Sequence, residues 1–405
     1  MASAIFPGSC FSPALSGVFP HRIWRARNLW VEGRSNMKEQ PKKQQEDLLA
    51  QIRSQYEPEL GLEGMSAAKM KDGWLLSRDP ESEAGYALWE VHKDPERVRL
   101  ALAWQEQVKA KGCAEVLTIR KTSQGESFIR REEGVFYLTE WVAGTPPEVD
   151  KRETLPAVAR GLAALYKHNY LPVPGGQLSG QQLPGEPAPE ELSLDEQAGL
   201  WLKGRQEKLT ELLKPFHFWR ENGATNDFER LYVENFPDLY ARGQEALEKI
   251  VLAGADWGNM PVGFLLANLA AENFWQTREG IVILRTTDWQ LGPLISSLAL
   301  LLKMYLPLQQ WNREVARETI RHYRACLPLR PSEKQYLLAD LAFPSRFWLY
   351  TRQYCAGQEK APVLAEKLKN YLYELTWQDQ CLTDLEQWLW EEEEAEQEKE
   401  GREKL

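Results

Sequence analysis

Residues 265–275 read LLANLAAENFW, and the interpretation of the whole chain depends on this stretch. An apolar pair is followed by the amide Asn268, and a second amide, Asn273, comes five residues later. After a short polar turn, residues 280–284 (GIVIL) have the character of a strand. Binding and catalytic groups gather on loops that a rigid scaffold positions, so this pattern predicts a functional loop that leads into a strand.

Upstream of this loop, the sequence predicts a small lobe of strands with one helix. Runs of strand character at 73–76, 85–91, 116–120, 127–130 and 135–142 are separated by turns rich in glycine and charged residues. Residues 94–111 carry apolar side chains between charges and predict the helix. The order strand, strand, helix and three strands predicts an α+β lobe over residues 61–143, preceded by a charged arm or short helix at 37–60.

Downstream, the pattern is helical. From Leu155 to about Trp390 apolar residues recur at helical spacing, apart from residues 274–288. This predicts a helical lobe over residues 144–390 that contains the loop-like segment 265–293. The Gly/Pro-rich stretch at 171–189 predicts a long mobile loop, and the run EEEEAEQEKE predicts an acidic disordered tail at 391–405.

The bulk composition excludes several classes of protein. Of the 405 residues, 43% are hydrophobic and 27% charged, which is an ordinary globular balance. The net charge is -10 and the basic residues form no stripe, so nucleic acid is not an expected partner. The longest apolar run, 294–305, is too short to span a membrane. The five cysteines have no metal-ligand spacing, and the 16 tryptophans, spread along the chain, favour core packing.

The first 36 residues do not resemble the lobes. They contain three prolines followed by a basic patch, an order that does not fit a secretory signal peptide. The peptide VEGRSN before Met37 is compatible with a purine-rich ribosome-binding site in the gene. We therefore expect residues 1–36 to be a non-native extension or a disordered leader, with Met37 as the alternative start.

Several motifs, in order, resemble the aminoglycoside/choline phosphotransferase superfamily and, within it, the CotS-type spore coat protein family. YLTEWVAG at 137–144 resembles a fifth strand and hinge. LLANLAAENF is similar to a family pattern of the type CHGDLAPHNF, and ILRTTDWQLGP to IDFDYAQLGP. The resemblance covers residues 50–385, with no single motif intact. It implies an α+β, protein-kinase-like two-lobed fold, in which a small β-sheet lobe precedes a mostly helical lobe.

The resemblance also assigns the positions that phosphoryl transfer needs. The catalytic base falls on Asn268, whose amide accepts no proton at neutral pH, and the usual histidine falls on Leu266. The magnesium-binding amide is retained as Asn273. The magnesium-binding carboxylate falls on Arg285 or, with a slipped register, on Thr286 or Thr287. Like unit charges about 4 Å apart repel by roughly 4 kcal/mol at an effective dielectric of 20, so Arg285 opposes a metal ion.

The phosphate-binding lysine of the third strand falls on Trp89. Lys69, Lys71 and Lys93 are the nearest replacements, but none has the phase of that strand. Three of these four groups, the three that are normally charged, are thus replaced together, which predicts a catalytically inactive pseudokinase and not an enzyme. The resemblance implies a structural or binding role at the spore coat after synthesis in the cytoplasm, with other spore coat or sporulation proteins as partners.

Two alternatives remain open. The first is an active, ATP-dependent phosphotransferase for a small hydroxyl acceptor, with an unusual metal site at Asp288 and Asn273 and with Glu272 as the one carboxylate of the loop. The second is ATP binding without magnesium, with Arg285 against the phosphates. For Arg285 itself, a pairing with a carboxylate or phosphate in the former metal site and a simple ion pair at a loop are equally compatible with the sequence. No cofactor is otherwise expected.

Overall fold

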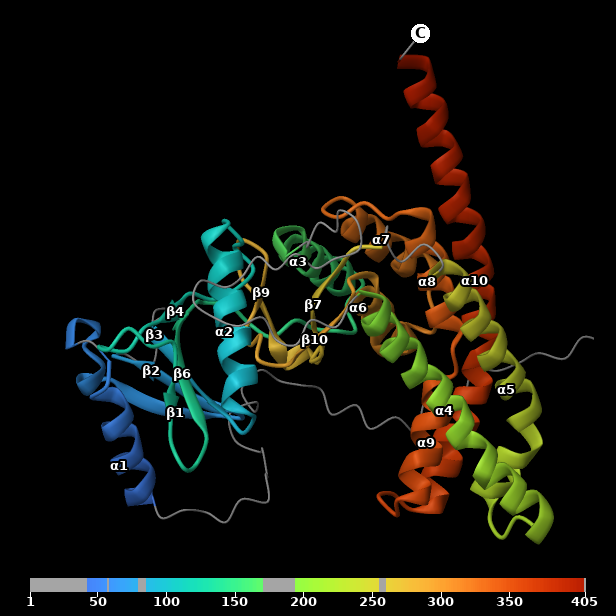
Figure 1. Ribbon diagram of the computed structural model, residues 1–405, viewed down its shortest axis with the longest axis horizontal. Helices are drawn as coiled ribbons and strands as arrows, with labels where there is room; N and C mark the ends of the chain where they lie inside the picture. The colour runs from blue at the N-terminus through green and yellow to red at the C-terminus, as the bar shows by residue number, and fades with distance from the viewer. Residues whose placement is uncertain (1–41, 57, 79–84, 170–193, 255–259, 404–405) are drawn as a thin grey trace, which may run out of the picture.

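The structure, a computed structural model, describes residues 42–56, 58–78, 85–169, 194–254 and 260–403 (Figure 1). It has two lobes, a sheet lobe up to residue 143 and a helical lobe from residue 144 onward. The predicted extension at 1–36 and the predicted loop at 171–189 lie outside the described residues. Within the described ranges, no helix combines the length and the apolar character needed to cross a membrane.

The sheet lobe is an antiparallel sheet with the strand order β1-β2-β3-β6-β4, in which β5 also pairs with β6. Its strands are β1 (Ser66–Met70), β2 (Gly73–Ser77), β3 (Gly85–Val91), β4 (Ile119–Arg120), β5 (Ile129–Arg130) and β6 (Val135–Trp141). Two helices, α1 (Lys42–Arg53) and α2 (Pro95–Ala110), pack on it. Two short 3₁₀ turns, η1 (Pro58–Leu60) and η2 (Leu62–Gly64), lead from α1 to β1.

Alternation along β3 places apolar side chains on both faces of the sheet. Leu88 belongs to the cluster that includes Leu49 and Ile52 of α1. Trp89, one residue on, belongs to the other cluster, with Val98 of α2. Each face is therefore covered by one helix, and Trp89 lies on the α2 side.

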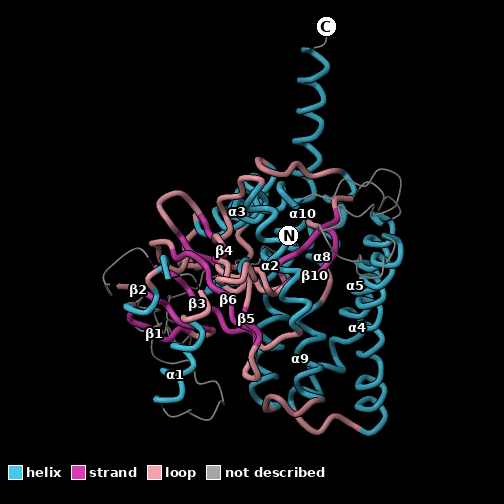
Figure 2. The backbone as a smooth tube through the Cα atoms, turned by 60° about the vertical axis from the view of Figure 1, so that its left-hand side comes forward, coloured by secondary structure: helices cyan, strands magenta, loops and turns pink. Residues whose placement is uncertain are grey.

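The helical lobe packs its helices around two apolar clusters. Figure 2 shows this lobe beside the sheet lobe. Its helices are α3 (Thr154–Asn169), α4 (Leu194–Asn222), α5 (Asp227–Gly254), α6 (Ile295–Tyr305), α7 (Arg313–Arg324), α8 (Pro331–Ala342), α9 (Ser345–Cys355) and α10 (Ala361–Glu403), with the 3₁₀ turn η5 (Leu306–Gln309) between α6 and α7. Two small antiparallel sheets join β7 (Val262–Leu266) to β10 (Trp289–Pro293) and β8 (Phe274–Gln276) to β9 (Ile281–Ile283).

The two-lobed α+β organisation agrees with the sequence prediction. The predicted helices and strands of the sheet lobe form, although the strands predicted at 116–120 and 127–130 are only two residues long, and the predicted strand at 280–284 is β9. Four strands were not anticipated: β1 before the predicted sheet, β7 and β10 within a region that reads as helical, and β8 in the segment before the predicted strand. The acidic residues after Trp390, expected to be a disordered tail, instead continue α10 as helix to Glu403, and this end projects beyond the body (Figure 1).

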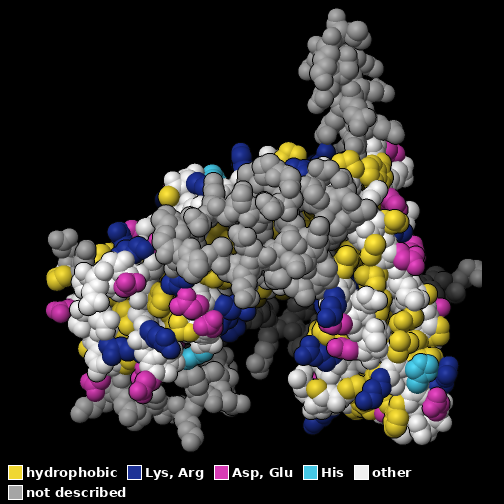
Figure 3. Space-filling model, viewed as in Figure 1, with side chains coloured by type: hydrophobic (Ala, Val, Ile, Leu, Met, Phe, Trp, Pro, Cys, Tyr) yellow, Lys and Arg dark blue, Asp and Glu magenta, His cyan; other side chains and the backbone are white. Residues whose placement is uncertain are grey.

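The surface in Figure 3 differs between the lobes. Over the sheet lobe, Lys, Arg, Asp and Glu side chains are interspersed, whereas hydrophobic side chains are more frequent over the helical lobe. Some large apolar side chains of this lobe are exposed, among them Phe218 of α4 and Leu252 of α5. Many of the tryptophans are nevertheless buried, as the packing interpretation expects; examples are Trp74, Trp89, Trp104, Trp219, Trp311 and Trp388.

Candidate functional site

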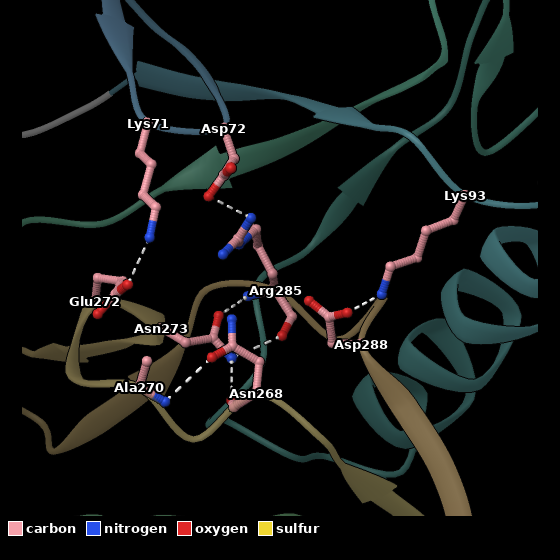
Figure 4. Close-up of polar contacts among 9 residues, drawn as sticks. All are labelled: Lys71, Asp72, Lys93, Asn268, Ala270, Glu272, Asn273, Arg285 and Asp288. Atoms are coloured by element: carbon pink, nitrogen blue, oxygen red, sulfur yellow. Dashed lines mark hydrogen bonds and ion pairs between the residues drawn. The ribbon is translucent and has the colours of Figure 1, made fainter. Parts of the chain in front are cut away.

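The loop 267–273 joins β7 to β8 and lies below the β1–β2 turn, where the two lobes meet (Figure 4). Its first residue is bonded to the segment between β9 and β10, because the Ala267 amide donates to the Asp288 carbonyl at 2.8 Å. Its last residues form a short 3₁₀ turn, η4 (Ala271–Asn273). The positions that the sequence singles out are therefore brought together at the seam between the lobes.

Asn273 is fully buried, and its side-chain amide forms hydrogen bonds with backbone groups. The side-chain Nδ2 donates to the carbonyl oxygens of Asn268 and Arg285, both at 3.0 Å. The side-chain Oδ1 accepts the Arg285 amide N–H, also at 3.0 Å. Asn273 thus joins the catalytic-like loop to the segment after β9, and these bonds occupy both ends of the amide expected to bind magnesium.

Asn268, at the expected position of the base, makes a local turn bond. Its Oδ1 accepts the amide N–H of Ala270 at 3.1 Å, the kind of bond by which asparagine stabilises loops. An amide at this position orients a neighbouring group but takes up no proton. Leu266, at the expected histidine position, is buried in β7.

Arg285 occupies the position expected for the metal-binding carboxylate, and its guanidinium is paired. The Nη1 atom lies 2.6 Å from Oδ2 of Asp72 in the β1–β2 turn. The side chain is only 13% exposed, and its guanidinium carbon lies 5.8 Å from the centre of the Trp89 ring. Thr286 and Thr287, the slipped-register alternatives, are both buried. Thr286 is engaged elsewhere, since its hydroxyl bonds to Oε1 of Gln105 at 2.5 Å.

The two carboxylates named as fallbacks are paired with lysines of the sheet lobe. Asp288 forms an ion pair with Lys93, toward which its carboxylate is directed (Figure 4). Glu272 forms an ion pair of 2.8 Å with Lys71. Burial alone would raise the pKa of Glu272, but the hydrogen bonds it accepts and the positive charges of Lys71 and Arg285 together outweigh burial, so the pKa is lowered. Both carboxylates are therefore held as charged partners of lysines.

Trp89 lies on β3, the strand in which the phosphate-binding lysine is expected. It is 4% exposed, and its indole N–H donates to the Thr139 hydroxyl of β6 at 3.0 Å. An indole in this place fills the apolar core of the lobe and carries no positive charge. Lys69, one of the possible replacements, lies over the ring of Trp74 and 3.4 Å from Glu90, so it too is engaged.

These residues do not fit a magnesium ion. Proteins usually bind Mg²⁺ through one or two carboxylates, whereas the expected ligand positions hold an amide bonded to backbone and a guanidinium. The neighbouring carboxylates of Asp288 and Glu272 are paired with lysines. Among the described residues, no group of three or more His, Cys, Asp and Glu side chains is placed to hold a metal. The only lining residues of the neighbouring recess with a polar side-chain group are Thr154 and Tyr305; the rest are the apolar Pro147, Val149, Leu155, Val158, Ala271, Phe274 and Leu301.

The sequence did not point to Asp72. The pairing residue comes from a two-residue turn after β1, a strand that the sequence pattern did not reveal. The signal available was the pair Lys71-Asp72 before Gly73, a polar dipeptide followed by glycine that is typical of tight turns. Lys71 itself was considered only as a replacement for the missing lysine, not as a partner of Glu272.

Comparison with solved structures identifies the fold. An aminoglycoside phosphotransferase from Alicyclobacillus acidocaldarius matches with a TM-score of 0.69 and 17% identity, covering 87% of this chain and 97% of that one. A choline/ethanolamine kinase family protein from Mesorhizobium loti matches with a TM-score of 0.48 and 15% identity, covering 84% and 98%. A spectinomycin phosphotransferase solved with ADP and spectinomycin matches with a TM-score of 0.47 and 11% identity, covering 84% and 97%.

No protein-family model matches the sequence, and no curated protein matches it. At these identities the likeness concerns the fold, and function must be argued from the site. The chain has the kinase-like fold of the aminoglycoside phosphotransferases, as its motifs predicted.

Proposed function

We propose that this protein is a catalytically inactive pseudokinase that acts as a structural or binding module. The observation that carries the proposal is Arg285, which places a guanidinium paired with Asp72 where kinases hold a magnesium-binding carboxylate. Phosphoryl transfer depends almost entirely on positioned metal ions and cations, so the loss of this group removes the centre of the mechanism.

The other positions support the same conclusion. Asn268 lacks a carboxylate to accept the proton of a hydroxyl, and Trp89 supplies no charge for phosphates. Asn273 is retained, but its three bonds give it a structural role within the loop. The two-lobed scaffold is kept while the charged groups expected for phosphoryl transfer are replaced, and such a scaffold can serve to bind another molecule.

The expected setting is the spore coat, with other spore coat or sporulation proteins as partners. This part of the proposal is supported by the ordered motifs at 137–144 and 265–293, which resemble CotS-type proteins. It is tested by probing coat extracts of purified spores from the source organism with an antibody to the chain. Detection in the coat fraction and absence from the soluble core supports the setting, while the reverse distribution contradicts it.

The enzymatic part is tested with labelled ATP. Full-length protein is incubated with γ-labelled ATP and magnesium, and the release or transfer of label is followed with the Asp288→Asn and Glu272→Gln variants alongside. We expect label release no higher than in a buffer blank for all three proteins. A magnesium-dependent release that falls in either variant would instead favour the active phosphotransferase that uses Asp288.

Binding of ATP without magnesium is the second candidate. It is favoured by the three cations near the cleft, Lys71, Lys93 and Arg285, which could face phosphate oxygens if their present carboxylate partners moved. Calorimetric titration with ATP in the presence of a chelator distinguishes it: measurable heat favours a nucleotide-binding pseudokinase, and none leaves the purely structural module.

A further inference from the structure

Three ion pairs connect the two lobes beside the catalytic-like loop, and their charges alternate. On the sheet lobe the order is Lys71, Asp72 and Lys93, which is positive, negative, positive. On the helical lobe their partners are Glu272, Arg285 and Asp288, which is negative, positive, negative. Figure 4 shows the three pairs side by side. We call these three pairs the ionic seam.

We propose that the ionic seam clasps the two lobes in a closed arrangement, with the pair of Asp72 and Arg285 at its centre. The proposal concerns movement of the lobes and goes beyond the proposed function, because a clasp holds or fails independently of phosphoryl transfer. The turn between β1 and β2 supplies the carboxylate of Asp72 to Arg285, so this pair joins a hairpin of the sheet lobe to the helical lobe.

The turn that carries Asp72 is firmly placed. The Glu90 amide of β3 donates to the Asp72 carbonyl at 3.0 Å, which fixes the end of the hairpin on the sheet. Gly73 follows directly, and a side chain there would meet the Leu88 carbonyl oxygen at 2.1 Å. The hairpin therefore packs tightly on β3, and Asp72 is presented by a rigid element.

The seam lies at the end of the sheet away from the covalent connection between the lobes. That connection follows β6, where Trp141 pairs with Gly85, and Thr145 exchanges backbone hydrogen bonds with Gln276. Asp72 instead bonds to Glu90, which pairs with Phe136 near the start of β6. Five residues of strand separate the two ends, about 17 Å. Bonds at this distance from the hinge oppose rotation of one lobe away from the other.

Hydrogen bonds from α2, outside the three ion pairs, also join the two lobes at this edge. Arg97 of α2 and Trp289 of β10 exchange two bonds, with Arg97 Nη2 donating to the Trp289 carbonyl at 3.0 Å and the indole N–H donating to the Arg97 carbonyl at 3.1 Å. Gln105, further along α2, accepts the Thr286 hydroxyl. The alternation of charge in the ionic seam also fixes how the two lobes align, because moving one lobe along the other by one pair would place like charges opposite each other.

The ionic part of the clasp is open to experiment because it is partly exposed. Lys71 and Glu272 are 66% and 43% exposed, and the Arg285–Asp72 pair is the most sheltered of the three. Exposed pairs are weakened by salt, since the screening length falls to about 3 Å at 1 M. Charge reversal therefore tests the sheltered Arg285–Asp72 pair, and the dependence of exchange on salt concentration tests all three pairs together.

The test is hydrogen–deuterium exchange on the full-length protein and three variants: Asp72→Arg, Arg285→Asp and the double reversal. Exchange is followed in peptides from residues 66–77 and 281–290, with peptides from α5 and α8 as the internal reference. The Glu318→Arg variant is the matched control, because it breaks the exposed Arg152–Glu318 pair within the helical lobe.

We expect each single reversal to speed exchange in the two seam peptides about tenfold, corresponding to about 1.4 kcal/mol, without a change in the reference peptides. The double reversal restores the pair with opposite polarity and should return exchange to within about twofold of the wild type. The Glu318→Arg control should leave the seam peptides unchanged.

Unchanged seam peptides in both single variants, or no recovery in the double variant, would overturn the clasp. If a single variant unfolds, exchange rises in the reference peptides too, and a salt series on the wild type then decides. Faster exchange of the seam peptides relative to the reference at 1 M NaCl supports the clasp, and salt-independent exchange rejects it.

Discussion

Replacement of Asn273 by alanine tests whether this retained amide holds the loop or binds a metal. The substitution removes three hydrogen bonds and leaves a backbone N–H of Arg285 and the carbonyls of Asn268 and Arg285 without these partners. A typical intramolecular hydrogen bond contributes about 1 kcal/mol, and an unsatisfied buried group costs somewhat more. Since Asn273 is fully buried, we expect Asn273→Ala to lower the free energy of unfolding by about 3–4 kcal/mol.

The assay is urea unfolding followed by circular dichroism, with and without millimolar magnesium. The matched control is Asn268→Ala, which removes one bond to the Ala270 amide in a half-buried loop and should cost about 1 kcal/mol or less. Both losses should be the same with and without magnesium. A loss below about 1 kcal/mol for Asn273→Ala, or one that appears only with magnesium, would refute the structural role.

Two further predictions concern buried charges of the helical lobe. Burial raises the pKa of Glu333 from 4.5 to about 7, so the stability that its protonated form contributes is complete below pH 4.5 and is lost as the pH rises through 7. The free energy of unfolding of the wild type should fall by up to about 3 kcal/mol between these limits because of this group. Urea unfolding at pH 5 and pH 8 should show that the Glu333→Gln variant lacks this loss. An equal pH dependence in both proteins would contradict this. Burial opposes ionisation of Asp340, but Arg205 and Lys303 lower its pKa to about 2, so its contribution is present above pH 3.8 and is lost as the pH falls through 2. The Arg205→Leu substitution should lower the free energy of unfolding by about 3 kcal/mol at neutral pH and move the midpoint of acid unfolding to higher pH. An unchanged midpoint pH of acid unfolding would contradict a stabilising role of the Arg205–Asp340 ion pair.

The sequence predicted the lobes because the periodicities that define them are strong. The alternating strand β3 and the capped helix α2, with Asp94 accepting from the Glu96 amide, follow local rules. The strand β1 was missed because its sequence, SAAKM, has little strand propensity and forms an exposed edge held by β2 alone. Strands β7 and β10 were missed because the surrounding apolar residues read as helix, and only their pairing with each other distinguishes them.

The sequence indicated which residues lie at the candidate site but not which charges they meet. The resemblance to the family motifs gave the positions of Asn268, Asn273 and Arg285, and the structure brings them together. Their partners come from distant segments: Asp72 from a hairpin that was not recognised, and Lys93 from the residues before α2. Sequence spacing carries no information about which charges meet across a lobe boundary, so the ionic seam became visible only in the fold.

The central claim is that the cleft holds no magnesium–nucleotide site. Its most direct test is a thermal-shift titration of the full-length protein with ATP, with and without magnesium. A ligand at about 100 times its dissociation constant stabilises a protein by about 2.7 kcal/mol, which such a scan detects. The account predicts no magnesium-dependent rise in the melting temperature at any ATP concentration. A rise that requires magnesium would contradict it and would favour the active phosphotransferase with a metal site at Asp288 and Asn273.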